Sequence, residues 1–150
     1  MKVFSSFTLL MLLANIAFAQ VKPDDICGIW LTEDSRGKME IFKNTQNNTY
    51  EIKVVWQKNS KEADGSEKLD KKNPKPELRK RTLQGMVFAT GLKWDADDKE
   101  WYGGDVYNPE DGNMYSCKAR LDGNRILRFR GYLWVSLLGK TTTWYRTVLY

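Results

Sequence analysis

The stretch ICGIWLTE, residues 26–33, decides the fold, because it begins a series of short segments in which apolar and polar side chains alternate. Gly28 and Trp30 stand two positions apart in it and therefore share one face of a strand. The last segment, TTTWYRTVL (141–149), carries an arginine, Arg146, in the same alternating phase as its apolar residues. If the first and last strands are neighbours, Arg146 lies over Trp30, where a cation–π contact contributes about 0.5–2 kcal/mol.

Six further segments between these two show the same alternation. They are GKMEIFK (37–43), TYEIKVVWQ (49–57), LQGMVFATGLKW (83–94), EWYGGDVYN (100–108), MYSCKARL (114–121) and ILRFRGYL (126–133). Most of the connections are short and contain the Asp, Asn, Gly and Pro residues of tight turns. The sequence therefore predicts an all-β fold, a single eight-stranded antiparallel up-and-down barrel, which leaves no exposed sheet edges.

The first nineteen residues are predicted to be a signal peptide. Lys2 precedes the apolar run FTLLMLLANIAF (7–18), which is too short for a transmembrane helix, and small residues at 17–19 permit cleavage after Ala19. We expect residues 20–150 to form one barrel domain, exported to a periplasm or secreted. We expect no transmembrane segment in the mature chain.

Cys27 and Cys117 are the two cysteines of the chain. Export would carry them into an oxidising compartment, so a disulfide between them is expected, stabilising by about 4–5 kcal/mol for a loop of this length. Two separate buried thiols are the alternative. The chain has no histidine, which excludes Ser–His and Cys–His catalysis and removes the commonest zinc ligand. No metal site and no cofactor are predicted.

Longer motifs, in the same order along the chain, are similar to those of one bacterial family. They are GIW (28–30), DKKNPKPELRKR (70–81), WYGGDVYNPEDGNMYS (101–116), and RGYL with LGKTTTWYR (130–146). The chain resembles the exported proteins called domain of unknown function 2147, and its Gly-x-Trp start and terminal arginine also resemble lipocalin-like barrels. The resemblance implies a lipocalin-like barrel with Gly28, Trp30, Trp144 and Arg146 in structural roles. It implies no established activity and no catalytic residues.

Seven aromatic side chains are predicted to point into the barrel. They are Trp30, Trp56, Trp101, Tyr107, Tyr115, Phe129 and Trp144. Each large ring buries about 150–250 Å², so the interior is either a packed aromatic core or a core with a small cavity near one mouth. In the second case we expect Trp101, Tyr107 and Tyr115 to contact a ligand.

The segment 58–81 interrupts the series of strands and carries nine Lys/Arg against five Asp/Glu. It is longer than most loops without secondary structure. Pro74 and Pro76 stiffen its second half, which we expect to fold toward a barrel mouth with Asn73 in a turn. Arg79 is then placed to donate hydrogen bonds either to backbone carbonyls or to a ligand carboxylate. In the second case, Asn73 and Arg79 are both predicted to contact the ligand.

Three classes of function follow. The first is an exported binding protein that holds a small apolar or amphipathic ligand in or at the mouth of the barrel. The second is an envelope-associated protein that contacts anionic polymers or lipid headgroups through residues 58–81. Nucleic acid is not an expected partner, because the chain has no recognised nucleic-acid module. The third is a hydrolase or isomerase using Asp105, which requires that Asp105 share the inner face with Trp101 and Tyr107.

Overall fold

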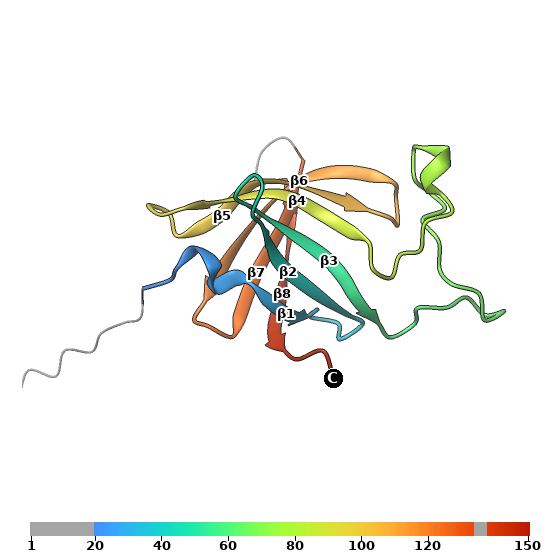
Figure 1. Ribbon diagram of the computed structural model, residues 1–150, viewed down its shortest axis with the longest axis horizontal. Coiled ribbons are helices and arrows are strands. Elements are labelled where there is room, and N and C mark those ends of the chain that lie inside the picture. Colours follow the sequence, from blue (N-terminus) through green and yellow to red (C-terminus); the bar gives the residue numbers. More distant parts are fainter. Residues whose placement is uncertain (1–19, 134–137) are drawn as a thin grey trace, which may run out of the picture.

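The computed structural model describes residues 20–133 and 138–150 and shows a closed barrel of eight antiparallel strands (Figure 1). Each strand pairs with the next, and the last pairs with the first. The strands are β1 (Gly28–Leu31), β2 (Gly37–Asn44), β3 (Thr49–Gln57), β4 (Val87–Asp95), β5 (Glu100–Asn108), β6 (Asn113–Asp122), β7 (Ile126–Tyr132) and β8 (Gly139–Thr147). The prediction of an eight-stranded up-and-down barrel is confirmed.

The predicted signal peptide, residues 1–19, lies outside the described residues, and its cleavage stays a prediction. Within residues 20–133 and 138–150, no helix has the length and apolar character needed to cross a membrane.

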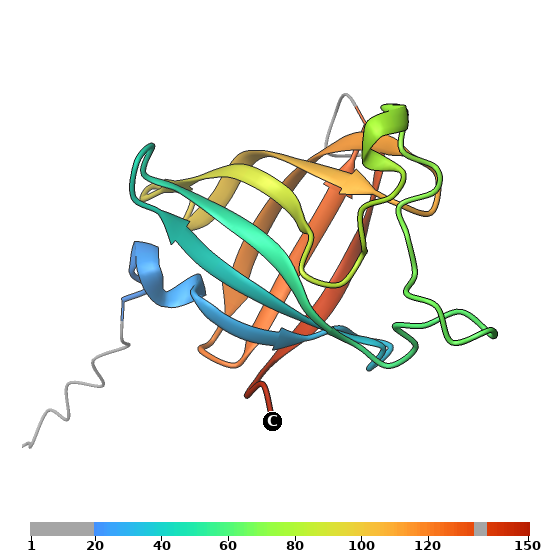
Figure 2. The same ribbon diagram turned by 45° about the vertical axis from the view of Figure 1, so that its right-hand side comes forward.

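The two ends of the barrel differ (Figure 2). The short 3₁₀ helix η1 (Pro23–Ile26) lies at the end where β1 begins, which we call the closed end. The long connection from β3 to β4 lies at the opposite end, which we call the open end. It contains the second 3₁₀ helix, η2 (Pro76–Leu78).

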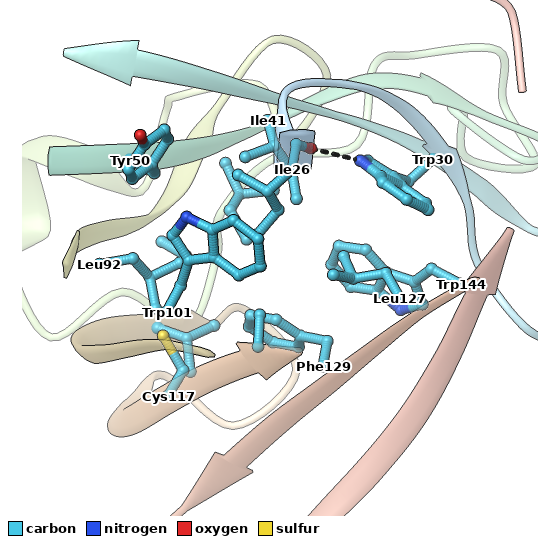
Figure 3. Packing of buried hydrophobic residues seen from close by; sticks show 14 of the residues in the cluster. Ile26, Trp30, Ile41, Tyr50, Leu92, Trp101, Cys117, Leu127, Phe129 and Trp144 are labelled. Atoms are coloured by element: carbon cyan, nitrogen blue, oxygen red, sulfur yellow. Dashed lines mark hydrogen bonds between the residues drawn. The ribbon is translucent and has the colours of Figure 1, made fainter. Parts of the chain in front are cut away.

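Two buried indoles fasten η1 to the closed end (Figure 3). Trp30 has no exposed surface, and its Nε1 donates a hydrogen bond of 2.9 Å to the carbonyl of Ile26. Trp101 is equally buried, and its Nε1 donates to the carbonyl of Pro23 at 3.0 Å. Trp101 also meets Tyr50 edge-to-face, with 6.3 Å between the ring centroids. Aromatic side chains therefore fill this half of the barrel. The two indole N–H groups are satisfied by carbonyls of η1, and the Tyr50 hydroxyl donates to the Asp24 carboxylate of the same helix.

Arg146 joins the last strand to the first. Its guanidinium carbon lies 4.2 Å from the ring centroid of Trp30, as the sequence predicts. Its Nε donates to the carbonyl of Asn124 at 2.6 Å, and its two terminal nitrogens donate to the carbonyls of Cys27 and Asp25. One side chain thus closes the barrel and satisfies carbonyls from two segments, the end of η1 and the turn between β6 and β7.

Gly28 makes room for this contact. Its φ is +132°, and a Cβ at this position would lie 2.9 Å from a terminal nitrogen of Arg146. A larger residue would both strain the backbone and displace the guanidinium. Gly28, Trp30 and Arg146 therefore depend on one another, because the guanidinium packs between the glycine and the indole ring.

The prediction that Trp56 points inward is wrong. A register shift between β2 and β3 pairs Lys38 with Trp56 but Met39 with Val54, so β3 has one extra residue at this point. The extra residue reverses the alternation. Trp56 is 37% exposed on the outer face, where the Lys38 ammonium lies 5.8 Å from its ring centroid.

The predicted disulfide is also wrong, because Cys27 and Cys117 are both free thiols. Cys27 precedes β1, which pairs with β2 and β8, whereas Cys117 lies on β6 between β5 and β7. The Cys117 thiol packs against Gly104 of β5, and it has no exposed surface. The two cysteines therefore belong to separate parts of the barrel wall.

Thiol reactivity tests this arrangement. We expect an alkylating reagent to modify only Cys27 in the native protein. Burial raises the pKa of both thiols, that of Cys117 to about 12, but Cys117 has no exposed surface whereas Cys27 is only half-buried. Intact mass after alkylation without reductant measures this directly. Denaturation should expose the second thiol, and a denatured, unreduced sample that resists alkylation at both positions would show that a disulfide forms.

Loss of Arg146 should destabilise the barrel. Arg146→Ala leaves the carbonyls unpaired, at about 1–3 kcal/mol, and loses about 0.5–2 kcal/mol of stacking on Trp30. Arg146→Lys should not restore the stability, since an ammonium lacks the planar fork that reaches several carbonyls. Lys80→Ala, an exposed change in the long loop, should stay within about 0.5 kcal/mol of wild type. Urea unfolding followed by tryptophan fluorescence gives the comparison, and wild-type midpoints for the Arg146 variants would refute the closing role.

Candidate functional site: a cavity at the open end

A cavity of about 980 Å³ occupies the open end of the barrel. Phe129 and Trp144 line it and stack on each other, with 4.7 Å between ring centroids and an angle of 21° between their planes. Other apolar lining residues come from strands β2 to β5 and from the connection before β4: Met39, Val54, Met86, Phe88 and Val106. The barrel interior is therefore packed with aromatic rings in its closed half and hollow in its open half.

The mouth of the cavity is polar and carries both signs of charge. Its charged lining residues are Glu33, Asp34, Arg36, Lys68, Glu110 and Lys140. Asp34 is held by a hydrogen bond from the Thr32 hydroxyl and by the backbone N–H of Arg36, and these bonds lower the pKa of its carboxyl. The arrangement suits a ligand with an apolar body and a polar end at the rim.

Gln57 brings an amide group to the wall of the cavity. The extra residue in β3 that turns Trp56 outward turns its neighbour Gln57 to the lumen side, and Gln57 lines the cavity. Its Oε1 is buried and accepts no hydrogen bond from the described part of the chain. A buried acceptor without a donor costs about 1–3 kcal/mol, so a ligand donor at this point would be favoured.

A buried carboxylate fastens the long loop beside the cavity. Asp70 has no exposed surface and accepts hydrogen bonds from the Tyr107 hydroxyl at 2.5 Å, from Asn73 Nδ2 at 2.8 Å, and from an Arg81 terminal nitrogen at 2.6 Å. Arg79 in turn donates through Nε to the Asn73 carbonyl at 2.7 Å. We call these five residues the Asp70 cluster.

Charge and hydrogen bonding in the Asp70 cluster shift the pKa values of Asp70 and Tyr107. Burial alone would raise the pKa of Asp70, but the bonds from Tyr107, Asn73 and Arg81, with the Arg81 charge, lower it below its usual value. Burial and the Asp70 carboxylate raise the pKa of Tyr107 to about 12. At neutral pH the cluster is therefore an ionised aspartate held by a neutral phenol and a cation.

The Asp70 cluster also brings together two of the sequence motifs. Lys72, in the motif 70–81, donates through Nζ to the carbonyl of Glu110 in the motif 101–116. A Cβ on Gly112 would lie only 2.2 Å from the Lys72 carbonyl oxygen, and Gly112 has a φ of +76°. Only glycine fits this contact, so the turn between β5 and β6 is shaped to receive the loop.

The structure separates the predicted ligand-binding residues into three groups. Tyr107 and Tyr115 both border the cavity. Tyr107, however, does not point into the barrel as predicted: it shares the outward phase of Asp105 on β5, and its hydroxyl meets Asp70 of the long loop. Trp101 lies in the packed closed end, where its indole nitrogen is bonded to η1. Asn73 and Arg79 belong to the Asp70 cluster and are not among the residues that line the cavity.

Asp105 does not meet the condition for a catalytic role. It is exposed on the outer face of β5, while Gly104 and Val106 beside it face the interior. The register shift between Trp101 and Gly104 inserts one residue and sets this phase. Among the described residues, no group of three Cys, Asp or Glu side chains is placed to hold a metal ion.

Sequence reasoning missed Asp70, Arg81 and Gln57. Asp70 and Arg81 look like two charges among many in a solvated loop, and their eleven-residue separation has no periodic meaning. Their one signal is the proximity of Asn73 and two prolines, which indicates an ordered segment. Gln57 was invisible because its inward direction depends on the extra residue in β3.

Comparison with solved structures agrees with this geometry. One structure is described as protein HP1028 from the human pathogen Helicobacter pylori, belonging to the lipocalin family. It is 30% identical, has a TM-score of 0.66, and the match covers 81% of this chain and 82% of that chain. The fold is therefore that of a lipocalin-like β-barrel, as expected from the sequence.

A family model described as an uncharacterized protein conserved in bacteria, domain of unknown function 2147, matches residues 28–146. The chain belongs to this family. The matched region runs from the glycine of β1 to the arginine of β8 that meet at the barrel seam. No curated protein matches the chain.

Substitution of Asp70 should release the loop. Asp70→Asn removes the charge that receives three hydrogen bonds, at about 1.5–3 kcal/mol. We expect trypsin to cleave the segment 71–81 roughly tenfold faster or more in this variant, because local opening becomes easier. Asp64→Asn, an exposed change in the same loop, is the matched control and should leave the cleavage rate unchanged. Equal rates for all three proteins would show that Asp70 does not hold the loop.

The same cluster predicts a dependence on pH. Because the pKa of Asp70 is lowered in the folded protein, its contribution is complete above the unfolded value of about 3.9 and is lost as pH falls through the folded value. Urea midpoints at pH 6 and pH 3 should therefore differ more for wild type than for Asp70→Asn. Parallel losses in the two proteins would contradict this assignment.

Proposed function

We propose that this protein is an exported binding protein that holds a small apolar or amphipathic ligand in the open-end cavity. The observation that carries the proposal is the cavity itself, with the stacked rings of Phe129 and Trp144 among its lining residues. Apolar surface that is not filled by the chain is costly unless something else covers it. Buried side chains such as Trp30, Tyr50 and Trp101 fill the closed half, so this cavity lies in the open half of the barrel.

The size and chemistry of the cavity favour one kind of ligand. A volume of about 980 Å³ lies at the upper end of the range for small-molecule sites, about 300–1,000 Å³. The apolar lining suits an acyl chain or a fused hydrophobic ring system. Gln57 on the wall offers hydrogen bonding, and the charges of both signs at the mouth suit a polar or zwitterionic end group.

Export is part of the proposal and is supported by the sequence. Residues 1–19 have the charge, apolar run and small residues of a cleavable signal peptide. Two free thiols do not contradict this, since Cys117 has no exposed surface and burial protects it from oxidants.

The other two classes of function receive less support. Several cations of residues 58–81 are engaged within the protein: Arg81 with Asp70, Lys71 with Glu62, and Lys72 with the carbonyl of Glu110. These contacts reduce the charge that the loop can offer to an anionic partner. An enzyme using Asp105 is not favoured, because Asp105 lies on the outer face away from the cavity.

Filling the cavity should abolish ligand binding. Val106 lines the cavity, and Val106→Phe adds a ring inside it; Val87→Phe makes the same change at a position that is 36% exposed. We expect wild type and Val87→Phe to bind cis-parinaric acid, a fluorescent fatty acid, and Val106→Phe to bind it at least tenfold more weakly. Titration of the probe fluorescence measures this.

A second cavity-filling variant keeps the test valid if Val106→Phe does not fold. Gly131 lines the cavity with an ordinary φ, and a Cβ there would meet only Val106 Cγ1, at 3.7 Å, so Gly131→Leu fills the space without backbone strain. Circular dichroism checks that each variant folds. Unchanged probe binding in both folded cavity variants, or no binding by wild type, would refute the proposed site.

A further inference from the structure

Two exposed leucines stand at the rim of the cavity. Leu133 follows β7 and is 45% exposed, and Leu138 precedes β8 and is 65% exposed. The N–H of Leu133 donates to the carbonyl of Leu138 at 3.0 Å, so the two residues are held side by side. Both line the cavity. Single exposed apolar residues need no explanation, but this pair is continuous with the apolar interior of the site.

Below this rim, the outer face of the barrel carries cations in directly opposed pairs. Lys118 on β6 faces Arg130 on β7, and Arg120 faces Arg128 in the next outward pair. Like charges placed directly opposite each other destabilise a sheet. The four cations therefore repel one another across the strand pair, and an anionic partner would relieve this repulsion.

These cations also have partners within the protein, and the neighbouring acids offset part of their charge. Arg128 and Arg130 donate hydrogen bonds to the hydroxyls of Thr143 and Thr141, at 2.7 and 2.9 Å. A Glu100 carboxylate oxygen lies 3.1 Å from Lys118 Nζ, and an Asp122 carboxylate oxygen lies 3.4 Å from a terminal nitrogen of Arg128. The side chains of Arg128 and Asp122 are each about half exposed or more, so solvent screens this pair. Lys140, which is exposed at the start of β8, adds a further cation next to the leucine rim. We call Leu133, Leu138, Lys140 and the four opposed cations the docking face.

The spacing of the docking face matches the depth of a lipid headgroup layer. Arg130 lies on β7, three residues before Leu133. At a rise of 3.3 Å per residue, the distance between the two positions along the strand is about 10 Å. The headgroup layer on each side of a bilayer is about 5–8 Å thick. When the leucines reach the acyl region, Arg130 therefore lies at or just outside the level of the phosphates. Arg128 lies two residues further back, about 17 Å from Leu133, and attracts the anionic headgroups through solution.

We propose that the docking face binds the surface of an anionic phospholipid bilayer, so that the cavity exchanges its ligand with the membrane. This inference rests on the proposed ligand-binding function, because the leucines are significant as the rim of that cavity. A soluble polyanion would contact the cations but would leave both leucines in water. A bilayer accounts for the apolar pair and the cations together.

Vesicle flotation tests the proposal. The purified protein should float with vesicles of phosphatidylcholine and phosphatidylglycerol, and much less with phosphatidylcholine alone. Leu133→Ser/Leu138→Ser should weaken binding about tenfold or more, because both side chains lose apolar burial. Arg120→Gln/Arg128→Gln should weaken it about fivefold per cation and reduce its sensitivity to salt. Val148→Ser/Leu149→Ser alters two exposed apolar residues that follow β8, at the opposite end of that strand from Leu138, and should have no effect.

Three outcomes would overturn the docking face. These are no binding to anionic vesicles, equal weakening by the two apolar pairs, or binding to a sulfated polysaccharide that the leucine substitutions leave unchanged while vesicles are not bound. All substituted residues except Arg120 and Arg128 are surface apolar positions, and thermal unfolding confirms that each variant folds. Titration with cis-parinaric acid in vesicle-free solution separates the two proposals. Probe binding without vesicle binding refutes the docking face alone, and the reverse refutes the proposed ligand site.

Discussion

The barrel depends on the contact between Arg146 and Trp30. β1 has only four residues, and within the described chain it pairs with β8 at three positions, Ile29 to Leu31. So short a ladder is a weak closure, because sheet stability increases with the number of paired residues. The guanidinium strengthens it by stacking on the indole and by donating to three carbonyls at the same end. The remaining seven ladders can then form a continuous wall.

Concentrating stability at one end allows the other end to be hollow. The closed half holds η1, Trp30 and Trp101 in a packed aromatic core, and their ring nitrogens find carbonyl partners within that core. The open half has no such filling, and its shape is instead maintained by the Asp70 cluster, which fixes the long loop against the turn between β5 and β6. An apolar core and a buried charged cluster thus serve different ends of one barrel.

Alternation along the strands was sufficient to predict the eight-stranded barrel, because a period of two has one structural meaning wherever it is sustained. The Trp30–Arg146 contact followed from the same rule applied at both termini. The rule failed where β3 has an extra residue, which reversed Trp56 and Gln57 without any sign in the sequence. The prediction of a disulfide failed for another reason. An oxidising compartment favours disulfides, but this argument does not tell whether two cysteines are close enough to form one. Asp70 was missed because its three partners lie in the loop and on a distant strand.

Among the described residues, the boundary between β8 and β1, which Arg146 closes at one end of the barrel, is unpaired toward the other end. β8 begins at Gly139 but meets β1 only from Tyr145 onward, so its first residues extend beyond the end of β1. There the Glu33 carboxylate replaces a strand partner by accepting from the N–H of Thr143 at 3.2 Å. Glu33 and Gly139 both line the cavity, and this part of the wall adjoins Leu138 of the docking face. In the described part of the chain, the seam between β8 and β1 is therefore unpaired on the side of the exposed leucines. Under the proposed membrane docking, an amphiphile that leaves the bilayer would enter the barrel here.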